Sequence, residues 1–138
     1  MTKNRGEILA PVSPGELLDK IAILEIKEER IVDEKKRANV RIELEALRRT
    51  ALECLPGEPD LTSYSIELKR INEAIWEIED DIRRCEKEKR FDTEFIELAR
   101  SVYKTNDRRA AVKRLVNQVL SSELVEEKSY VDYEGEQG

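Results

Sequence analysis

The sequence predicts an all-α protein in which a long antiparallel two-helix hairpin carries two shorter C-terminal helices on its open end. Two observations lead to this prediction. Charged residues make up 41% of the 138 residues and there are only 5 glycines and 4 prolines, a composition typical of long exposed helices. Apolar residues also recur at intervals of three and four over residues 61–85, which is the period of a helix. A single domain of this length can bury a core.

The first predicted helix spans residues 14–55. Ser13 can cap it, Pro14 suits a first helical turn, and Glu16 can complete a capping box. Beyond that turn, no Gly or Pro interrupts the span. The helix would be roughly 60 Å long at 1.5 Å per residue. We expect residues 1–12 to form an extended arm.

The second predicted helix spans residues 61–90 and has the clearest periodicity in the chain. Its apolar seam is sustained for more than three heptads, as in a coiled coil. The loop Pro56–Pro59 ends the first helix, and its shortness makes the two long helices antiparallel neighbours. This register places Trp76 beside Val40.

Two shorter helices are predicted at residues 92–104 and 107–121, followed by an acidic tail over residues 122–138. Asp92 can cap the first of them, and the polar run Thr105–Asp107 is expected to break the chain between them. These helices should cover the part of the first long helix that the second does not reach, which would create a concavity.

Composition excludes several classes of function. The chain has no histidine, which removes Ser-His-Asp and Cys-His catalysis and nearly all zinc sites. Its net charge of −6 argues against a nucleic-acid partner. No run approaches the ~20 apolar residues of a membrane span. Only two cysteines, Cys54 and Cys85, and a start without a signal-peptide pattern predict a cytoplasmic location.

A polar stripe on the second predicted helix is the first candidate binding feature. Asn72, Trp76, Glu79 and Arg83 step along one face beside the apolar seam. Tryptophan is costly to expose, so we expect the stripe to be partly buried and its polar members to be paired with one another or with a ligand. The alternative is a solvated face on which Trp76 packs against the stem of Arg83.

A basic cluster near the end of the chain is the second feature. Six basic residues and one acid lie between Arg100 and Arg114, in a chain that is acidic overall. The predicted helix start near Asn106 also favours an anion. The alternative is internal pairing, because the tail over residues 123–136 carries six acids against one lysine and could fold back onto the cluster.

Together the two features define a candidate site. The predicted ligand-binding residues are Trp76, Glu79, Arg83, Asn106, Arg109, Lys113 and Asn117. The basic side chains would contact an anion, the two asparagines would hydrogen-bond it, and the tryptophan would form an apolar wall. The leading interpretation is a non-catalytic helical module for an anionic small molecule or a protein partner, with no cofactor.

Two other interpretations stay open. Glu25-x-x-Glu28 and Glu77-x-x-Asp80 are similar to the paired carboxylates with which all-α nucleotide pyrophosphohydrolases hold Mg²⁺, which would make the protein a Mg²⁺-dependent phosphohydrolase. However, 31 acids in 138 residues give about seven such pairs by chance, and the two pairs lie further apart than in that family. The other interpretation is a structural, coiled-coil-like homo-oligomer joined through leftover apolar surface.

Four motifs together resemble those of a bacterial family of unknown function. They are VSPGELLDKI from Val12, IWEIED from Ile75, ARSVYKTNDRRA from Ala99 and EEKSY from Glu126. The resemblance covers nearly the whole chain and implies a setting in sugar transfer or cell-surface polysaccharide synthesis, but it implies no reaction. Its motifs fall on both candidate features, which favours a binding site.

Overall fold

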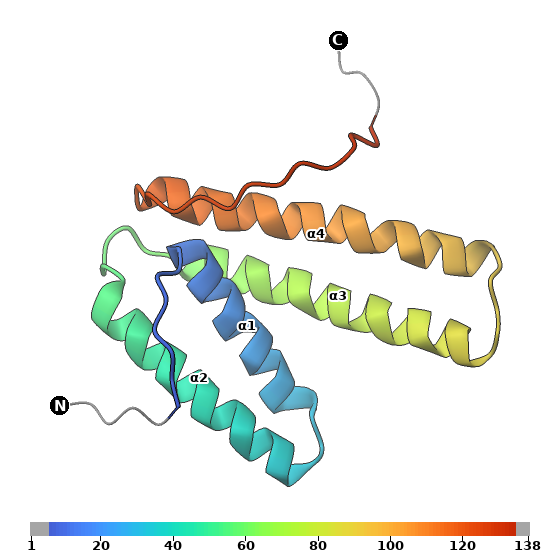
Figure 1. Ribbon diagram of the computed structural model, residues 1–138, viewed down its shortest axis with the longest axis horizontal. Coiled ribbons are helices and arrows are strands. Elements are labelled where there is room, and N and C mark those ends of the chain that lie inside the picture. Colours follow the sequence, from blue (N-terminus) through green and yellow to red (C-terminus); the bar gives the residue numbers. More distant parts are fainter. Residues whose placement is uncertain (1–5, 135–138) are drawn as a thin grey trace.

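The structure, a computed structural model, describes residues 6–134 and contains four helices and no strand within that range (Figure 1). The helices are α1 (Pro14–Arg30), α2 (Glu34–Cys54), α3 (Thr62–Lys87) and α4 (Thr93–Val119). The predicted all-α class is confirmed. Residues 1–5 of the predicted arm and 135–138 of the predicted tail lie outside the described residues.

The prediction of one helix over residues 14–55 is wrong, because α1 and α2 are separate helices. α1 ends where Ile31 turns to extended backbone with φ −74° and ψ 125°. Asp33 then caps α2 by accepting hydrogen bonds from two backbone amides of its first turn. No Gly or Pro lies at this junction, but the β-branched pair Ile31–Val32 and the capping side chain of Asp33 accompany the end of one helix and the start of the next.

As a result, α1 lies at the centre of the fold. It packs against α2, α3 and α4, whereas α2 packs against no other described helix than α1. Two hairpins, α1–α2 and α3–α4, therefore replace the single predicted hairpin (Figure 1). The predicted proximity of Trp76 to Val40 is wrong, since Val40 instead packs with Leu24 and Leu44 between α1 and α2.

The two predicted C-terminal helices form one continuous helix, α4. Asp92 caps it as predicted, accepting a hydrogen bond from a first-turn amide at 3.2 Å. The predicted break at Thr105–Asp107 is wrong because side chains of this run serve contacts other than capping. Thr105 is buried, and the side chain of Asn106 accepts a hydrogen bond from Arg109. Polar residues of the kind that end helices also occur inside them when such partners are available.

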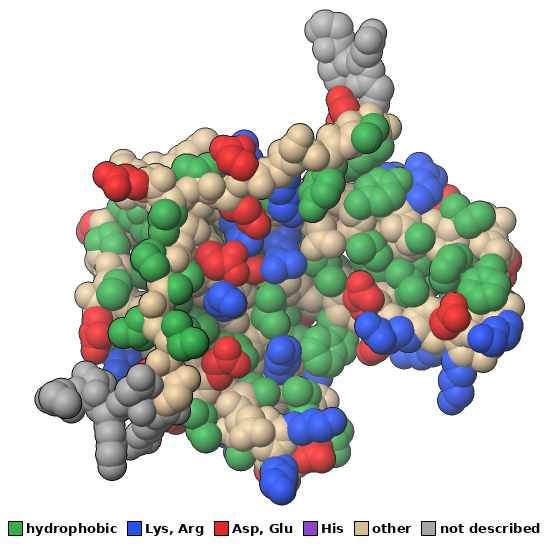
Figure 2. Space-filling view, in the orientation of Figure 1, with side chains coloured by type: hydrophobic (Ala, Val, Ile, Leu, Met, Phe, Trp, Pro, Cys, Tyr) green, Lys and Arg blue, Asp and Glu red, His purple; other side chains and the backbone are tan. Residues whose placement is uncertain are grey.

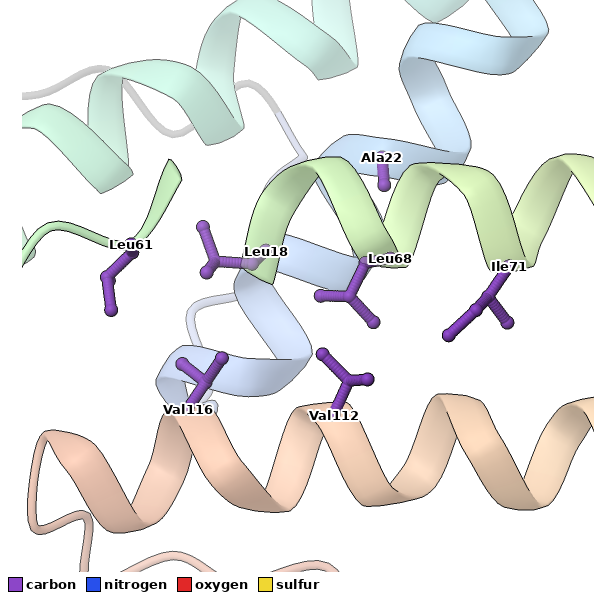
Figure 3. Packing of buried hydrophobic residues seen from close by; sticks show 7 residues of the cluster. All are labelled: Leu18, Ala22, Leu61, Leu68, Ile71, Val112 and Val116. Atoms are coloured by element: carbon purple, nitrogen blue, oxygen red, sulfur yellow. The ribbon is translucent and has the colours of Figure 1, made fainter. Parts of the chain in front are cut away.

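The main core lies where α1 meets α3 and α4. Its buried members are Leu18, Ala22, Leu61, Leu68, Ile71, Val112 and Val116 (Figure 3). Removing the Leu, Ile and Val side chains among them from water contributes about 1.5–3 kcal/mol each. This core holds α1 across the α3–α4 hairpin, so that the first turns of α1 lie beside the last turns of α4.

Two segments without helix flank this framework. In the N-terminal arm, Ile8 and Leu9 are 92% and 91% exposed, so their side chains do not join the core. The C-terminal segment, residues 122–134, runs back along α4 (Figure 1). Among the described residues, no helix is both long enough and apolar enough to cross a membrane.

Candidate functional site

The candidate site begins where the first turn of α1 touches the end of α4. The amide of Gly15 donates a hydrogen bond to Oδ1 of Asn117 at 2.8 Å. A Cβ atom on Gly15 would lie 2.4 Å from the carbonyl oxygen of Lys113, so glycine is required for this close approach. Asn117, predicted to contact a ligand, is therefore buried and occupied in joining two helices.

A fully buried carboxylate, Asp19, joins three helices. Nε of Arg109 lies 3.0 Å from each of its oxygens, and Nη2 lies 2.6 Å from Oδ2. The side-chain amide of Asn72 donates to Oδ1 at 2.8 Å. A buried carboxylate is costly unless it is paired in this way. Asp19 on α1 thus determines how the side chains of Arg109 on α4 and Asn72 on α3 are oriented.

Lys113 extends this network toward the surface. Its side chain is only 6% exposed, and Nζ lies 2.7 Å from a carboxylate oxygen of Glu16 and 2.8 Å from one of Glu126. Oδ2 of Asp19 lies 4.0 Å away. Ser13 caps α1 as predicted, but the carboxylate of Glu16, expected to complete the capping box, pairs with Lys113. We call Glu16, Asp19, Arg109, Lys113 and Glu126 the Asp19 cluster.

Burial and ion pairing act in opposite directions on the two cations of this cluster. Burial lowers the pKa of Lys113, but hydrogen bonds to Glu126 and Glu16 outweigh it, so the pKa is raised. Burial likewise opposes the charge on Arg109, and the hydrogen bonds to Asp19 again raise the pKa. The hydrogen bond from Lys113 lowers the pKa of Glu126. At neutral pH these three side chains are therefore charged.

A groove of about 320 Å³ opens on one side of Arg109. Its lining comes from α1, α3 and α4 and consists of Ile23, Ile26, Lys27, Asn72, Ile75, Trp76, Glu79, Asp80 and Arg109. Trp76, the single tryptophan of the chain, is half-buried as predicted. The guanidinium of Arg30 lies 5.8 Å from the centre of its ring. The structure thus brings together three predicted site residues, Trp76, Glu79 and Arg109.

A small polar pocket of about 70 Å³ also includes Arg109 in its lining. It is lined by Asn106, Arg109, Ala110, Lys113, Glu126 and Lys128. Figure 2 shows acidic and basic side chains gathered where the C-terminal segment crosses the α1–α4 junction. Arg109 therefore lines both an apolar groove and a charged pocket, and the pocket includes the predicted residues Asn106 and Lys113.

Two of the predicted residues, Asn117 and Arg83, do not join the others. Arg83 is exposed on α3 and lines neither the groove nor the pocket. Arg30, rather than Arg83, accompanies Trp76. The alternative of internal pairing is realised at two points, since Glu126 pairs with Lys113 and Glu127 lies 3.8 Å from Arg114.

The four carboxylates of the magnesium hypothesis are not assembled into one site. Three of them pair with arginines: Glu25 with Arg48 at 2.8 Å, Glu28 with Arg41 at 3.5 Å and Glu77 with Arg30 at 3.6 Å. Asp80 lines the groove instead. Throughout residues 6–134, no three His, Cys, Asp or Glu side chains come together in a way that could hold a metal ion.

Sequence reasoning missed Asp19 and the role of Glu16. A signal for Asp19 was present, because this acid lies among the apolar residues Leu17, Leu18 and Ala22 at the start of α1. A carboxylate inside an apolar run needs a buried partner. The EEKSY motif likewise held Glu126 and Lys128, both of which line the pocket.

Comparison with known families places this geometry in context. The model described as "Family of unknown function (DUF6165)" matches residues 8–134. The chain belongs to this family. The matched range includes the groove, the Asp19 cluster and the C-terminal segment. No curated protein and no solved structure matches the chain. An interpretation of the function must therefore come from the site itself.

Proposed function

We propose that the protein is a non-catalytic binding module for a small ligand that carries an apolar face and an anionic group. The apolar face would lie in the groove against Trp76, and the anionic group would bind Arg109. The observation that carries this proposal is the position of Arg109, which is anchored by Asp19 and lines both the groove and the polar pocket.

The anchoring of Arg109 suits it to this role. A guanidinium has five N–H donors in a rigid fork. In the described chain, Nε and Nη2 bond to Asp19, and Nη1 bonds to Asn106 at 3.3 Å. Two N–H groups remain for an acceptor in the groove or pocket. Because Asp19 already fixes the side chain, binding costs less conformational entropy than it would at a free surface arginine.

This proposal assigns ligand contacts to fewer residues than the sequence predicted. The cation that a ligand meets first is Arg109, since Lys113 is occupied by Glu16 and Glu126 and Arg83 lies outside the groove. Asn106 is retained beside Arg109, whereas Asn117 is assigned to the fold. Glu79 and Asp80 could accept hydrogen bonds from hydroxyl groups of the same ligand.

The proposal also includes a cellular process and a compartment in which the protein would act. The resemblance noted from the motifs favours an accessory role in bacterial glycan synthesis, and the cysteine usage favours the cytoplasm. Nucleotide-sugars meet the chemical requirement, because they combine a planar base and a sugar with a diphosphate. They are therefore the first ligands to test.

The test uses Trp76 as a built-in fluorescent probe. Wild-type protein would be titrated with UDP-glucose and with inorganic phosphate, followed by tryptophan fluorescence and isothermal titration calorimetry. R109K keeps the charge but loses the fork, and should weaken binding about tenfold, equivalent to ~1.4 kcal/mol. R108K changes the neighbouring exposed arginine and should have no effect. Absence of binding by millimolar ligand, or equal weakening in both variants, would refute the proposal.

A homo-oligomer is the second candidate, supported by the far end of the α3–α4 hairpin. This end extends beyond α1 (Figure 1), and Figure 2 shows hydrophobic side chains gathered on it. Phe91 and Ile96 are each 53% exposed there. A second copy packing on the hairpin would complete a four-helix arrangement. Sedimentation velocity at two concentrations tests this, and a monomer at both would argue against it.

A further inference from the structure

The Asp19 cluster holds more carboxylates than cations, which disfavours the addition of another anion. Two cations, Arg109 and Lys113, face three carboxylates, those of Asp19, Glu16 and Glu126. An anionic ligand added to this cluster would be a fourth negative group, and like charges at short range repel strongly where water is excluded. A ligand that replaced one of the carboxylates would leave the charge balance of this cluster unchanged.

Of the three carboxylates in the cluster, that of Glu126 is the one that a ligand can displace. Asp19 and Glu16 lie on α1, and Asp19 is fully buried. Glu126 lies on the C-terminal segment, which has no helix in the described chain, and its side chain is 39% exposed. The backbone near it is held by Arg114, whose Nη2 lies 3.5 Å from the carbonyl oxygen of Glu126. Release of this segment would leave all four helices intact.

Two neighbouring side chains would leave with the segment, whereas Lys113 would stay in place on α4. Glu127, 3.8 Å from Arg114, and Lys128, at the rim of the polar pocket, belong to the same segment and would leave with Glu126. Nζ of Lys113 would remain paired with the Glu16 carboxylate at 2.7 Å, and the position beside it that Glu126 now occupies would be open to a ligand. The released pocket is thus a cationic position one helical turn from Arg109 on α4.

We propose that Glu126 is an internal occupant of the anion site and determines which anions bind there. This inference rests on the proposed function. A ligand whose acid group reaches Lys113 replaces the Glu126 carboxylate and releases the C-terminal segment. Its apparent affinity is lowered by the fraction of molecules in which the segment is docked.

The chain offers a matched pair of variants for the test. E126Q and E127Q each remove one negative charge from adjacent positions, but Glu126 pairs with Lys113 whereas Glu127 pairs with the exposed Arg114. Full-length wild type and both variants would be titrated with inorganic phosphate and UDP-glucose by calorimetry. We expect E126Q to bind about fivefold more tightly than E127Q, because its segment no longer competes. Circular dichroism would confirm that all three proteins are equally helical.

Amide hydrogen exchange reports on the segment itself. In wild type, saturating ligand should speed exchange of residues 123–131, and in E126Q exchange should be fast without ligand. Equal affinities of E126Q and E127Q, or exchange that saturating ligand does not change, would overturn the inference while leaving the proposed function standing. Failure of both probes to bind any of the three proteins would overturn both proposals.

Discussion

Asp19 and Arg109, 90 positions apart in the sequence, form a two-point ion pair that ties the first helix to the last. Asn72 of α3 completes the arrangement by donating to the same carboxylate. Because this pair is buried on the Asp19 side and lines a groove on the Arg109 side, it serves two purposes. It fixes the crossing of three helices, and it presents a cation in a defined orientation.

Removal of the Asp19 charge should destabilise the protein strongly. D19N keeps the size of the side chain but leaves the cations Arg109 and Lys113 without their central partner. Breaking a buried pair in this way typically costs about 3–5 kcal/mol, and since Arg109 is 27% exposed we expect a smaller loss of roughly 2–3 kcal/mol. Urea denaturation followed by circular dichroism measures this loss in the free energy of unfolding.

D81N is the matched control, because Asp81 pairs with Arg84 on the exposed face of α3. Exposed pairs of this kind contribute about 0–1 kcal/mol. If D19N lowered the free energy of unfolding no more than D81N does, the Asp19–Arg109 pair would not be what holds α1 to α4.

The helices were predictable from the sequence, but their boundaries and partners were only partly so. The seam of α3 and the caps at Ser13 and Asp92 could be recognised because periodicity and capping are local signals. The turn at Ile31–Asp33 lacked Gly and Pro, and the run at Thr105–Asp107 had the residue types of a cap. Which of these ends a helix depends on tertiary partners, and no local pattern contains that information.

The residues of the candidate site were likewise only partly predictable from the sequence. Trp76 and Arg109 could be selected because a single tryptophan beside polar residues and a basic cluster in an acidic chain are unusual. Asp19 was missed because its partners lie 53 and 90 positions away. The role of Asn117 in the fold was not predicted because its bond to the amide of Gly15 depends on the crossing of α1 and α4.

Gly15 should not tolerate a methyl group. Glycine to alanine inside a helix normally stabilises a protein by about 0.5–1 kcal/mol. In G15A the added Cβ would lie 2.4 Å from the carbonyl oxygen of Lys113 and 3.0 Å from Oδ1 of Asn117. We therefore expect the opposite sign, a loss of roughly 1–3 kcal/mol in the free energy of unfolding, measured by urea denaturation.

G57A serves as the comparison, because no heavy atom lies within 4 Å of a Cβ at that position. We expect it to change stability by less than about 1 kcal/mol. A G15A protein as stable as G57A would show that α1 and α4 can separate there without cost.

The two cysteines should differ sharply in reactivity. Cys54, at the end of α2, is exposed, whereas Cys85 on α3 is 1% exposed. In native protein a thiol reagent should modify one cysteine rapidly, and the second about a hundredfold more slowly, since Cys85 must await a local opening of ~2.7 kcal/mol or more. Absorbance with a chromogenic disulfide reagent follows both phases. C54S should remove the fast phase alone, and two equally fast thiols would contradict the placement of α3.

Docking of the C-terminal segment should depend on pH through Glu126. The hydrogen bond from Lys113 lowers the pKa of this carboxyl below its ordinary value of 4.5. The contact therefore stabilises the docked segment at pH values above 4.5 and is lost as the pH falls through the lowered pKa. Lys113, whose pKa is raised above 10.5, keeps its charge across the neutral range and loses it only in strong alkali.

Amide exchange of residues 123–131, corrected for its intrinsic pH dependence, should show this release between pH 7 and pH 3. Glu16, Asp19 and Arg109 also face the same lysine or carboxylate, so the contribution of Glu126 must be separated from that of its neighbours. E126Q separates the two effects, because its segment should be released at every pH, whereas E127Q should behave like wild type. A segment equally protected at pH 3 and pH 7 in wild type would show that the Glu126–Lys113 pair does not hold it.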